Sequence, residues 1–285
     1  MEKITRKSFV KGALGLGAVS LLAGCGSSAS STAASSTAAP AEKKEFTFAD
    51  TVRWDAEYDV VVMGMGAAGM VAAKTAADNG AKVVVVEKCE EGKAGGNTKV
   101  CGQLFAYANG DKDAAKTYYN ALAGGRDIEP EIIDTISEGV ANMADILADE
   151  FGFNKDEYTD WTGVNVAGTN LGAMSPEYPE MPGHEKMALW TTHAGVSDSY
   201  LYQGLKQNVL DRADAIDVWY STPAKSLIQD PVTKTVVGVT VERDGKEMNI
   251  HAINGVCICT GGFECNKEMV QHYLNVINYA PRGGQ

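Results

Sequence analysis

One stretch of the sequence constrains the fold more than any other. An apolar run at residues 59–63 leads directly into the glycine-rich turn Gly64-Met65-Gly66-Ala67-Ala68-Gly69, and the alanine-rich residues 70–78 that follow predict a helix. A second apolar run, at residues 82–86, ends at Glu87. Short apolar runs of this kind are typical of strands buried on both faces of a parallel sheet. The sequence therefore predicts a strand–helix–strand unit in an α/β protein with a Rossmann-like parallel sheet.

The glycines of this turn have distinct predicted roles. Gly64 permits the tight turn, Gly66 lets the backbone approach a phosphate, and Gly69 lets the helix pack closely on the strand. The start of the helix offers main-chain N–H groups to an anion. Glu87 lies where a carboxylate can bind ribose hydroxyls, and its charge disfavours a 2′-phosphate. A purely structural turn would not explain this acid, so we expect a dinucleotide to contact Gly64, Gly66, Ala67, Ala68, Gly69, Glu87 and Lys88.

A second glycine-rich segment, Glu-Glu-Gly-Lys-Ala-Gly-Gly-Asn-Thr-Lys-Val-Cys-Gly, follows at residues 90–102. It resembles the loop after the ribose acid in the FAD-dependent fumarate reductase/succinate dehydrogenase flavoprotein superfamily, whose soluble branch includes fumarate reductases, urocanate reductases and 3-ketosteroid dehydrogenases. Paired glycines also let main-chain N–H groups face an anion. The alternative is a plain glycine-rich turn. The resemblance implies FAD as the cofactor and gives binding roles to Gly95, Gly96, Asn97, Thr98 and Gly102.

A group of predicted strands precedes a third glycine turn near the end of the sequence. The strands are expected at residues 216–221, 223–228, 235–242, 247–253 and 255–259, with a hairpin turn at Asp244-Gly245. Members of the superfamily carry a three-stranded meander on the dinucleotide domain. The resemblance implies FAD contacts from Ala224, Thr260, Gly261 and Gly262. The alternative for the last three residues is a simple strand-to-helix turn, and residues 267–274 predict that helix.

Cysteine and histidine positions bear on how FAD is attached. Residues 89–110 contain no histidine, and membrane-bound relatives attach FAD through a histidine in this loop, so the resemblance implies non-covalent FAD. A thioether at Cys101 is the alternative, but we expect a packed thiol there. The five cysteines after Cys25, Cys101 included, are scattered and odd in number, which predicts buried thiols rather than a disulfide framework. With four histidines in the chain, we expect no metal site.

The middle of the chain carries a weaker signal. Apolar residues at helical spacing predict one helix over residues 129–151, begun by Pro130 and ended by Gly152. Residues 153–195 predict a long irregular segment that lines a substrate cleft. We expect His184 and His193 to be surface or capping residues, and a functional role for either histidine is the alternative. A further helix is expected from Tyr200 to Val209.

The N-terminal residues predict a targeting signal rather than part of the fold. A basic head precedes an apolar run from Gly12 to Gly24, as in a signal peptide. Leu22-Ala23-Gly24-Cys25 resembles the bacterial lipoprotein processing box, and residues 5–11 resemble a twin-arginine signal in which Lys7 replaces the second arginine. An amphipathic helix of the mature fold is the alternative. We expect a signal peptide at residues 1–24, a lipidated Cys25 with a Ser/Ala-rich linker at residues 25–56, and an FAD-binding domain at residues 57–285.

Charge and hydropathy exclude two classes of partner. The 285 residues include 37 acidic and 25 basic side chains, a formal net charge of −12. An acidic chain without a dense basic patch is not expected to bind nucleic acid. No apolar stretch reaches the roughly 18–20 residues of a spanning helix. We expect an extracytoplasmic, cell-membrane lipoprotein of a bacterium that meets the membrane only through its lipid anchor.

The resemblance implies a function and its alternatives. Complete superfamily members continue past the third glycine turn into a capping domain, which we expect this chain to lack, together with the catalytic residues. We therefore assign no catalytic residue. The implied activity is an FAD-dependent oxidoreductase of the fumarate reductase type, in which flavin N5 gives hydride to an activated C=C bond of a small organic acid or related acceptor. The electron donor would be a cytochrome or an FMN-bearing protein. The alternatives are a 3-ketosteroid-type dehydrogenase and a truncated non-catalytic FAD-binding module. An NAD dehydrogenase without flavin ranks third among the alternatives.

Overall fold

The computed structural model describes residues 46–163 and 178–274. It divides the chain into two units, residues 1–53 and 54–285. The described part of the first unit contains the single turn η1 (Phe48–Thr51). The Asp50 carboxylate caps this turn by accepting hydrogen bonds from the N–H and the hydroxyl of Thr47. The predicted signal peptide, Cys25, residues 26–45 of the linker and residues 275–285 lie outside the described residues. Within the described ranges, no helix is long and apolar enough to span a bilayer.

The second unit is built on a six-stranded sheet with the order β6-β2-β1-β9-β8-β7. β1 (Ala56–Met63) lies between β2 (Val83–Val86) and β9 (Lys246–Ile258), and β6 (Ile216–Trp219) pairs with the other edge of β2. These four strands run parallel. Every residue of β2 is buried, because both faces of the sheet are covered. The predicted Rossmann-like parallel sheet is confirmed.

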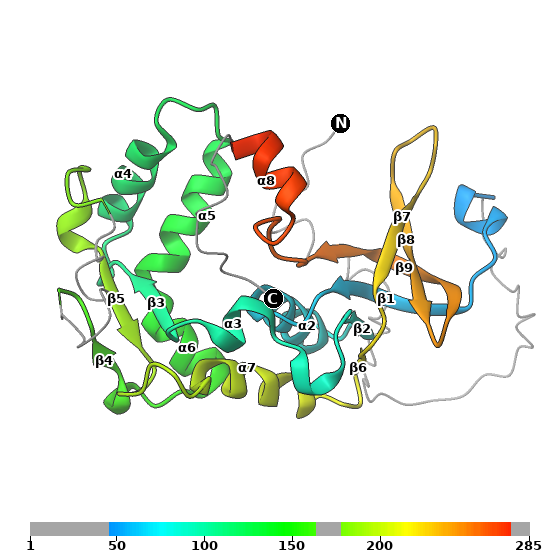
Figure 1. The fold of residues 1–285 in the computed structure, drawn as a ribbon, viewed down its shortest axis with the longest axis horizontal. Helices are drawn as coiled ribbons and strands as arrows, with labels where there is room; N and C mark the ends of the chain where they lie inside the picture. The colour runs from blue at the N-terminus through cyan, green and yellow to red at the C-terminus, as the bar shows by residue number, and fades with distance from the viewer. Residues whose placement is uncertain (1–45, 164–177, 275–285) are drawn as a thin grey trace, which may run out of the picture. The chain divides into compact units, whose positions relative to one another are not determined.

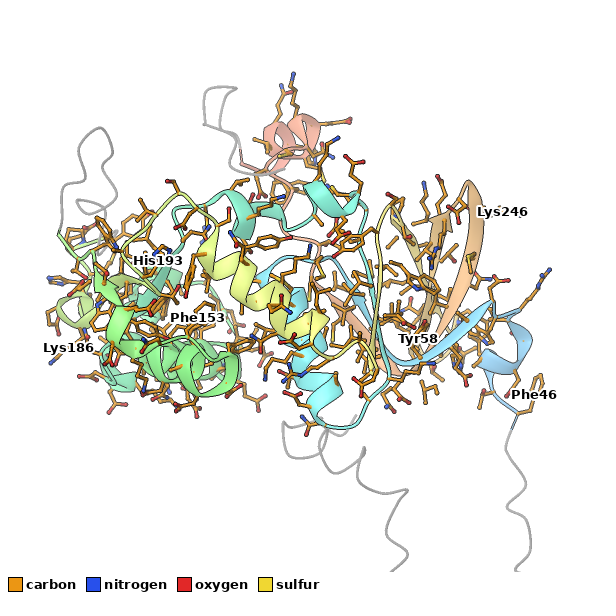
Figure 2. The ribbon with its side chains drawn as sticks, turned by 90° about the horizontal axis from the view of Figure 1, so that it is seen from below. Phe46, Tyr58, Phe153, Lys186, His193 and Lys246 are labelled. Atoms are coloured by element: carbon orange, nitrogen blue, oxygen red, sulfur yellow. The ribbon has the colours of Figure 1, made fainter. Side chains whose placement is uncertain are left out.

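Three strands at the far side of this sheet form the predicted meander. β7 (Ala224–Gln229) and β8 (Val236–Arg243) pair antiparallel, and β8 pairs antiparallel with the first half of β9. Figure 1 shows them in yellow to orange. The turn at Asp244 (φ 52°) and Gly245 (φ 71°) has both residues in the left-handed region, as a two-residue hairpin requires. Lys246 marks this hairpin tip in Figure 2.

β9 is one continuous strand, although the sequence predicted two strands at residues 247–253 and 255–259. Its first half pairs with β8, and its second half runs parallel to β1. The register with β1 shifts between Tyr58 and Val60, opposite Gly255 with its φ of 136°. Pairing with β8 on one side and β1 on the other keeps the strand intact through this irregularity.

An irregularity in β1 itself accompanies that shift. The N–H groups of Asp59 and Val60 both donate to the Lys82 carbonyl oxygen, at 2.9 and 3.2 Å. Two residues thus share one acceptor, which is the signature of a β-bulge. As a result Tyr58 packs in the same cluster as Val61, on the face with the meander, and Val60 packs on the opposite face.

A pair of helices covers one face of the sheet. On the other face, the β8 side chains Val239 and Val241 cluster with Val61. α2 (Ala67–Asp78) joins β1 to β2 and packs against α7 (Tyr200–Leu210), shown crossing it in Figure 2. Their buried side chains join one cluster with the sheet. That cluster includes Val60, Val62, Met70, Ala73, Leu205 and Val209.

A second, three-stranded sheet corrects the prediction of an irregular segment at residues 153–195. β5 (Ala188–Thr191) pairs antiparallel with β3 (Leu104–Tyr107) on one side and with β4 (Thr159–Asp160) on the other. The short turns η3 (Lys155–Glu157) and η5 (His184–Lys186) flank these strands. β3 lies more than eighty residues before β5, so the pairing of these two strands has no local signature. Residues 164–177 of the segment lie outside the described residues.

The predicted helix over residues 129–151 is two helices, α5 (Pro130–Ala141) and α6 (Met143–Phe151). The carbonyl oxygens of Val140 and Ala141 accept from Ala108 N–H and Gly110 N–H, at 3.1 and 3.0 Å. These contacts turn the end of α5 toward the chain after β3. Pro130 in the first turn and Gly152 in the left-handed conformation (φ 76°) bound the pair as predicted.

The remaining helices complete the described part. α4 (Lys112–Ala123) lies beside α5, as Figure 1 shows in green. Its N-terminus is capped by the Asp111 carboxylate, which accepts from Ala114 N–H. α8 (Lys267–Leu274) follows the third glycine turn with the predicted bounds.

Candidate functional site: a three-turn nucleotide cradle

The first glycine turn is shaped by close packing within the protein. Gly64 has φ 105°, and a Cβ there would lie 2.5 Å from the Cys259 carbonyl oxygen. A Cβ at Gly69 would overlap the Gly64 carbonyl oxygen. Both positions therefore require glycine for the fold itself, and Gly69 allows α2 to approach β1 as predicted.

Gly66 differs from its neighbours because protein packing does not require it. It has ordinary backbone angles (φ −80°), and a Cβ there would meet no protein atom closer than 3.8 Å. It is the N-cap of α2 and has no side chain to cap the helix. Ala68 is exposed in the first turn. The main chain here therefore faces open space at the positive end of a helix dipole, which is where an anion binds favourably.

Glu87 lies directly behind this turn, at the end of β2. Its side chain is 6% exposed. One carboxylate oxygen accepts from Met65 N–H and the other from Cys89 N–H, both at 2.8 Å. A carboxylate has about four acceptor positions, so each oxygen keeps a lone pair for a further donor. The acid thus fixes the first glycine turn and retains capacity for a vicinal diol.

The second glycine turn opens the short helix α3 (Gly96–Val100). Gly95 has φ 120°, and a Cβ there would collide with the Tyr202 ring at 2.5 Å. Gly96 has φ 51° with nothing within 4 Å of a Cβ, so it too faces open space. Thr98 reaches back to the first turn: its hydroxyl oxygen accepts from Ala67 N–H at 2.9 Å.

The third glycine turn contacts both of the others. Its strand reaches Gly64 through the Cys259 carbonyl. Asn97 Nδ2 donates to Glu264 Oε1 at 3.0 Å, which joins the second turn to the third. Gly261 has φ 74° with open space around it. We call the three turns, residues 64–69, 95–98 and 260–264, the nucleotide cradle.

Other predicted contact residues lie around the cradle. The main chain of Glu87 accepts from Thr222 N–H at 2.8 Å, which brings Ala224 at the start of β7 near the ribose acid. Lys88 is exposed beside Glu87, and Gly102 is half-buried after α3. Thr260 and Gly262 are exposed in the third turn. Contact of FAD with these residues stays a prediction.

Two residues of the site were not found from the sequence. Glu264 bridges the second and third turns through Asn97, and Gln103 bonds the end of α3. Neither residue is a glycine, and neither belongs to one of the sequence motifs used to predict the site. For Gln103 the one available signal is its place directly after Gly102 in the glycine-rich segment.

The predicted environment of the cysteines is partly wrong. Cys257 and Cys259 point to the same face of β9, and burial raises the pKa of both thiols. Cys101 and Cys265 are exposed. Cys101 lies at the end of α3, where its thiol donates to the Thr98 carbonyl oxygen at 3.4 Å, so it is not a packed thiol. None of the five described cysteines forms a disulfide, and the described ranges contain no cluster of potential metal ligands.

The two histidines of the central segment serve local structure. His184 Nδ1 lies 2.8 Å from the Met181 carbonyl oxygen in η5. His193 pairs with Asp198 at 3.0 Å and lies against the Tyr200 ring (Figure 2 labels it). These are the capping and surface roles that the sequence predicted.

The residues of the cradle fit FAD. A pyrophosphate needs main-chain N–H groups free of overlying side chains, and Gly66 and Gly96 leave that space open. A ribose needs an acceptor at the end of the second strand, where Glu87 lies. The fold and the site together define a dinucleotide-binding α/β domain of the flavoprotein type.

Comparison with known proteins gives the family. A family model described as an FAD binding domain matches residues 59–282. The chain belongs to this FAD-binding family, and the predicted cofactor, FAD, is confirmed. Non-covalent attachment stays a prediction.

Named relatives agree with the predicted resemblance. The NADH:fumarate oxidoreductase of Klebsiella pneumoniae is 29% identical over 225 residues, covering 76% of this chain and 22% of its own length. The 3-oxosteroid 1-dehydrogenase of Comamonas testosteroni is 26% identical over 284 residues, covering 77% of this chain and 49% of its own. The chain therefore spans half or less of the length of these relatives.

A solved structure shows the same fold. The 3-ketosteroid Δ1-dehydrogenase of Sterolibacterium denitrificans superposes with a TM-score of 0.59 at 22% identity, over 76% of this chain and 50% of that one. The likeness supports the Rossmann-like fold assignment.

Proposed function

We propose that the chain is the FAD-binding part of a flavin-dependent oxidoreductase that reduces an activated C=C bond of a small organic acid or related acceptor. The observation that carries the proposal is the nucleotide cradle, in which three glycine turns meet beside Glu87. The family assignment and the fumarate-acting relative support the reaction class.

In this proposal the described residues hold and orient the cofactor. The N-terminus of α2 and the open amides at Gly66 and Gly96 bind the pyrophosphate, and Glu87 binds the ribose. Bound FAD supplies the redox chemistry by exchanging hydride with the acceptor. Thr98 holds the second turn against the first, and Asn97 holds it against the third. The residues that bind the acceptor and protonate it are not assigned.

The first experiment identifies the ligand. The full chain is purified, its visible spectrum is recorded, and the ligand released by denaturation is identified by chromatography and mass. Release of intact FAD by denaturation alone supports both the cofactor and its non-covalent attachment. Release of NAD, or protein without any dinucleotide, would refute the proposal.

A 3-ketosteroid-type dehydrogenase is the second candidate, because a steroid dehydrogenase is among the relatives. The two functions run in opposite directions on different substrates. Oxidation of the reduced protein by fumarate-like acids supports the first candidate, and desaturation of a 3-ketosteroid by the oxidised protein supports the second. FAD binding with neither turnover would indicate a non-catalytic FAD-binding module.

We also propose that the protein is exported and lipid-anchored, with electrons supplied by a cytochrome or an FMN-bearing protein. The support is the signal-like sequence of residues 1–24 and the lipoprotein-type box at Cys25. Metabolic labelling with a fatty acid tests the anchor. We expect label in the wild type and none in Cys25→Ala, and an unlabelled wild type would contradict the anchor.

A further inference from the structure

One buried side chain, Gln103, connects the second glycine turn to the helix behind it. It is 1% exposed and has φ 58°, in the left-handed region that a glutamine rarely occupies. A buried amide needs hydrogen-bond partners for both its nitrogen and its oxygen, because an unpaired one is costly. The partners of Gln103 therefore show what the side chain is built to hold.

The amide nitrogen of Gln103 holds the end of α3. It donates to the carbonyl oxygens of Thr98 and Cys101, at 3.0 and 2.9 Å. The last carbonyls of a helix have no partner within the helix, and a five-residue helix is too short to be stable alone. Gln103 thus caps α3 from the side of the protein core.

The amide oxygen of Gln103 holds the start of α7. It accepts from Tyr202 N–H at 3.3 Å, in a first turn that has no side-chain cap at Ser199. The Ser199 hydroxyl instead donates to the Lys99 carbonyl oxygen at 2.5 Å. Two side chains therefore fasten the end of α3 to the beginning of α7, and Gln103 is the buried one.

α3 is the element whose position matters to the cradle. Thr98, whose carbonyl Gln103 binds, places its hydroxyl on Ala67 N–H at the start of α2. Tyr202 donates its N–H to the Gln103 amide oxygen, and its ring lies against Gly95. A shift of α3 would move the second glycine turn away from the first.

We propose that Gln103 is a positioning residue for FAD: it fixes α3 on α7 and thereby sets the distance between the first and second glycine turns. It acts through Thr98 and Tyr202 and need not touch the cofactor. The proposal rests on the proposed function in one respect, that FAD occupies the nucleotide cradle.

The test measures FAD affinity in substituted full-length protein. Gln103→Met keeps the volume but removes both hydrogen-bonding groups, and Gln103→Glu keeps the shape but cannot donate to two carbonyls. We expect the dissociation constant of FAD, measured on apoprotein by titration, to rise at least tenfold in both. Gln103→Asn keeps the amide on a shorter stem and should lie between them and the wild type.

Two control variants separate positioning from general loss of stability. Gln229→Met removes an exposed amide that donates to the Lys234 carbonyl in the meander turn. Ser137→Val disturbs a fully buried residue of α5 that hydrogen-bonds the Ile133 carbonyl, so it lowers stability elsewhere. Both should bind FAD like the wild type when measured well below their unfolding temperatures.

A double-mutant cycle with Thr98→Val measures whether the two substitutions affect FAD affinity independently. A merely structural role of Gln103 would leave the two effects independent. If Gln103 acts through Thr98, the two substitutions together weaken FAD binding by less than the product of their separate effects. Folded Gln103 variants with wild-type affinity, or fully multiplicative effects, would overturn the inference. If Gln103→Met does not fold, the FAD affinities of folded Gln103→Asn and Gln103→Glu are compared with that of the wild type instead. A wild type that binds no FAD would refute the proposed function before any substitution is made.

Discussion

The hydroxyl oxygen of Thr98 accepts a hydrogen bond from the main-chain N–H of Ala67 at 2.9 Å, across 31 residues of sequence. This bond joins the second glycine turn to the first turn of α2. It fixes the wall of the site beside Gly66, where an added Cβ would meet no protein atom closer than 3.8 Å. The nucleotide cradle is therefore assembled by the protein's own contacts.

Two glycines of the first turn, Gly66 and Gly69, should respond oppositely to alanine. In Gly66→Ala the new methyl group meets no protein atom closer than 3.8 Å, so the apoprotein should unfold at nearly the wild-type temperature. FAD affinity should fall at least tenfold, because the methyl group occupies the space for phosphate. In Gly69→Ala the methyl group overlaps the Gly64 carbonyl oxygen, so folding itself should suffer. Thermal unfolding with and without FAD distinguishes them, and a stable, FAD-free Gly69→Ala would contradict the packing role.

Replacing Glu87 with glutamine should affect stability as well as binding. Both carboxylate oxygens accept main-chain N–H groups, and a glutamine supplies only one acceptor oxygen. One buried N–H would lose its partner, at a cost of about 1–3 kcal/mol in the free energy of unfolding. Urea unfolding measures this loss, and FAD titration should show weaker binding. Glu131→Gln, in the first turn of α5, serves as the control and should change neither quantity.

The pairing of Asp78 with Arg212 should make part of the stability depend on pH. The Arg212 guanidinium holds the pKa of the Asp78 carboxyl below its ordinary value, with Lys74 adding to the effect. A lowered folded-state pKa stabilises the protein above the unfolded pKa of about 3.9, and the contribution disappears as pH falls through the folded value.

Asp78→Asn should therefore lower the free energy of unfolding at pH 7 by less than about 1 kcal/mol, since the pair is partly exposed to solvent. The difference from the wild type should vanish in strong acid. Denaturant unfolding between neutral and acid pH measures this, with Asp127→Asn in the α4–α5 connection as the control. A difference that grows toward acid would contradict the sign.

Thiol labelling should separate four of the described cysteines into two classes. Cys101 and Cys265 are exposed and should react with a maleimide first. Burial raises the pKa of the Cys257 and Cys259 thiols, so their thiolate form is scarce and they should react last. Peptide mapping after timed labelling measures the order. Fast reaction of Cys257 in the native protein would show that β9 is not covered as described.

The elements predicted correctly from sequence are those whose cause is local. The apolar runs of β1 and β2, the hairpin at Asp244-Gly245 and α8 each follow from residues that lie within the element or beside it. The glycine spacing of residues 64–69 also predicted a turn whose shape now has a packing explanation at Gly64 and Gly69. The family resemblance added FAD to the dinucleotide prediction.

The elements that sequence reasoning missed depend on distant partners. β5 forms because β3 and β4 supply both edges, and α5 ends because Ala108 and Gly110 bind its last carbonyls. Gln103 is important because Thr98 and Tyr202 lie on either side of it in space. Composition or periodicity within a short window carries no record of such contacts.

The Lys82 carbonyl oxygen, which accepts from both Asp59 N–H and Val60 N–H, affects how the helices pack on the sheet. Side chains of a regular strand alternate between the two faces, but here Tyr58 and Val61 face the same side. In a regularly alternating β1, Val60 and Val62 would face the same side as Tyr58 rather than α2 and α7. Val61 would then face α2 and α7 in their place. The shared acceptor at Lys82 thus determines which valines of β1 pack beneath the helix that begins at the first glycine turn.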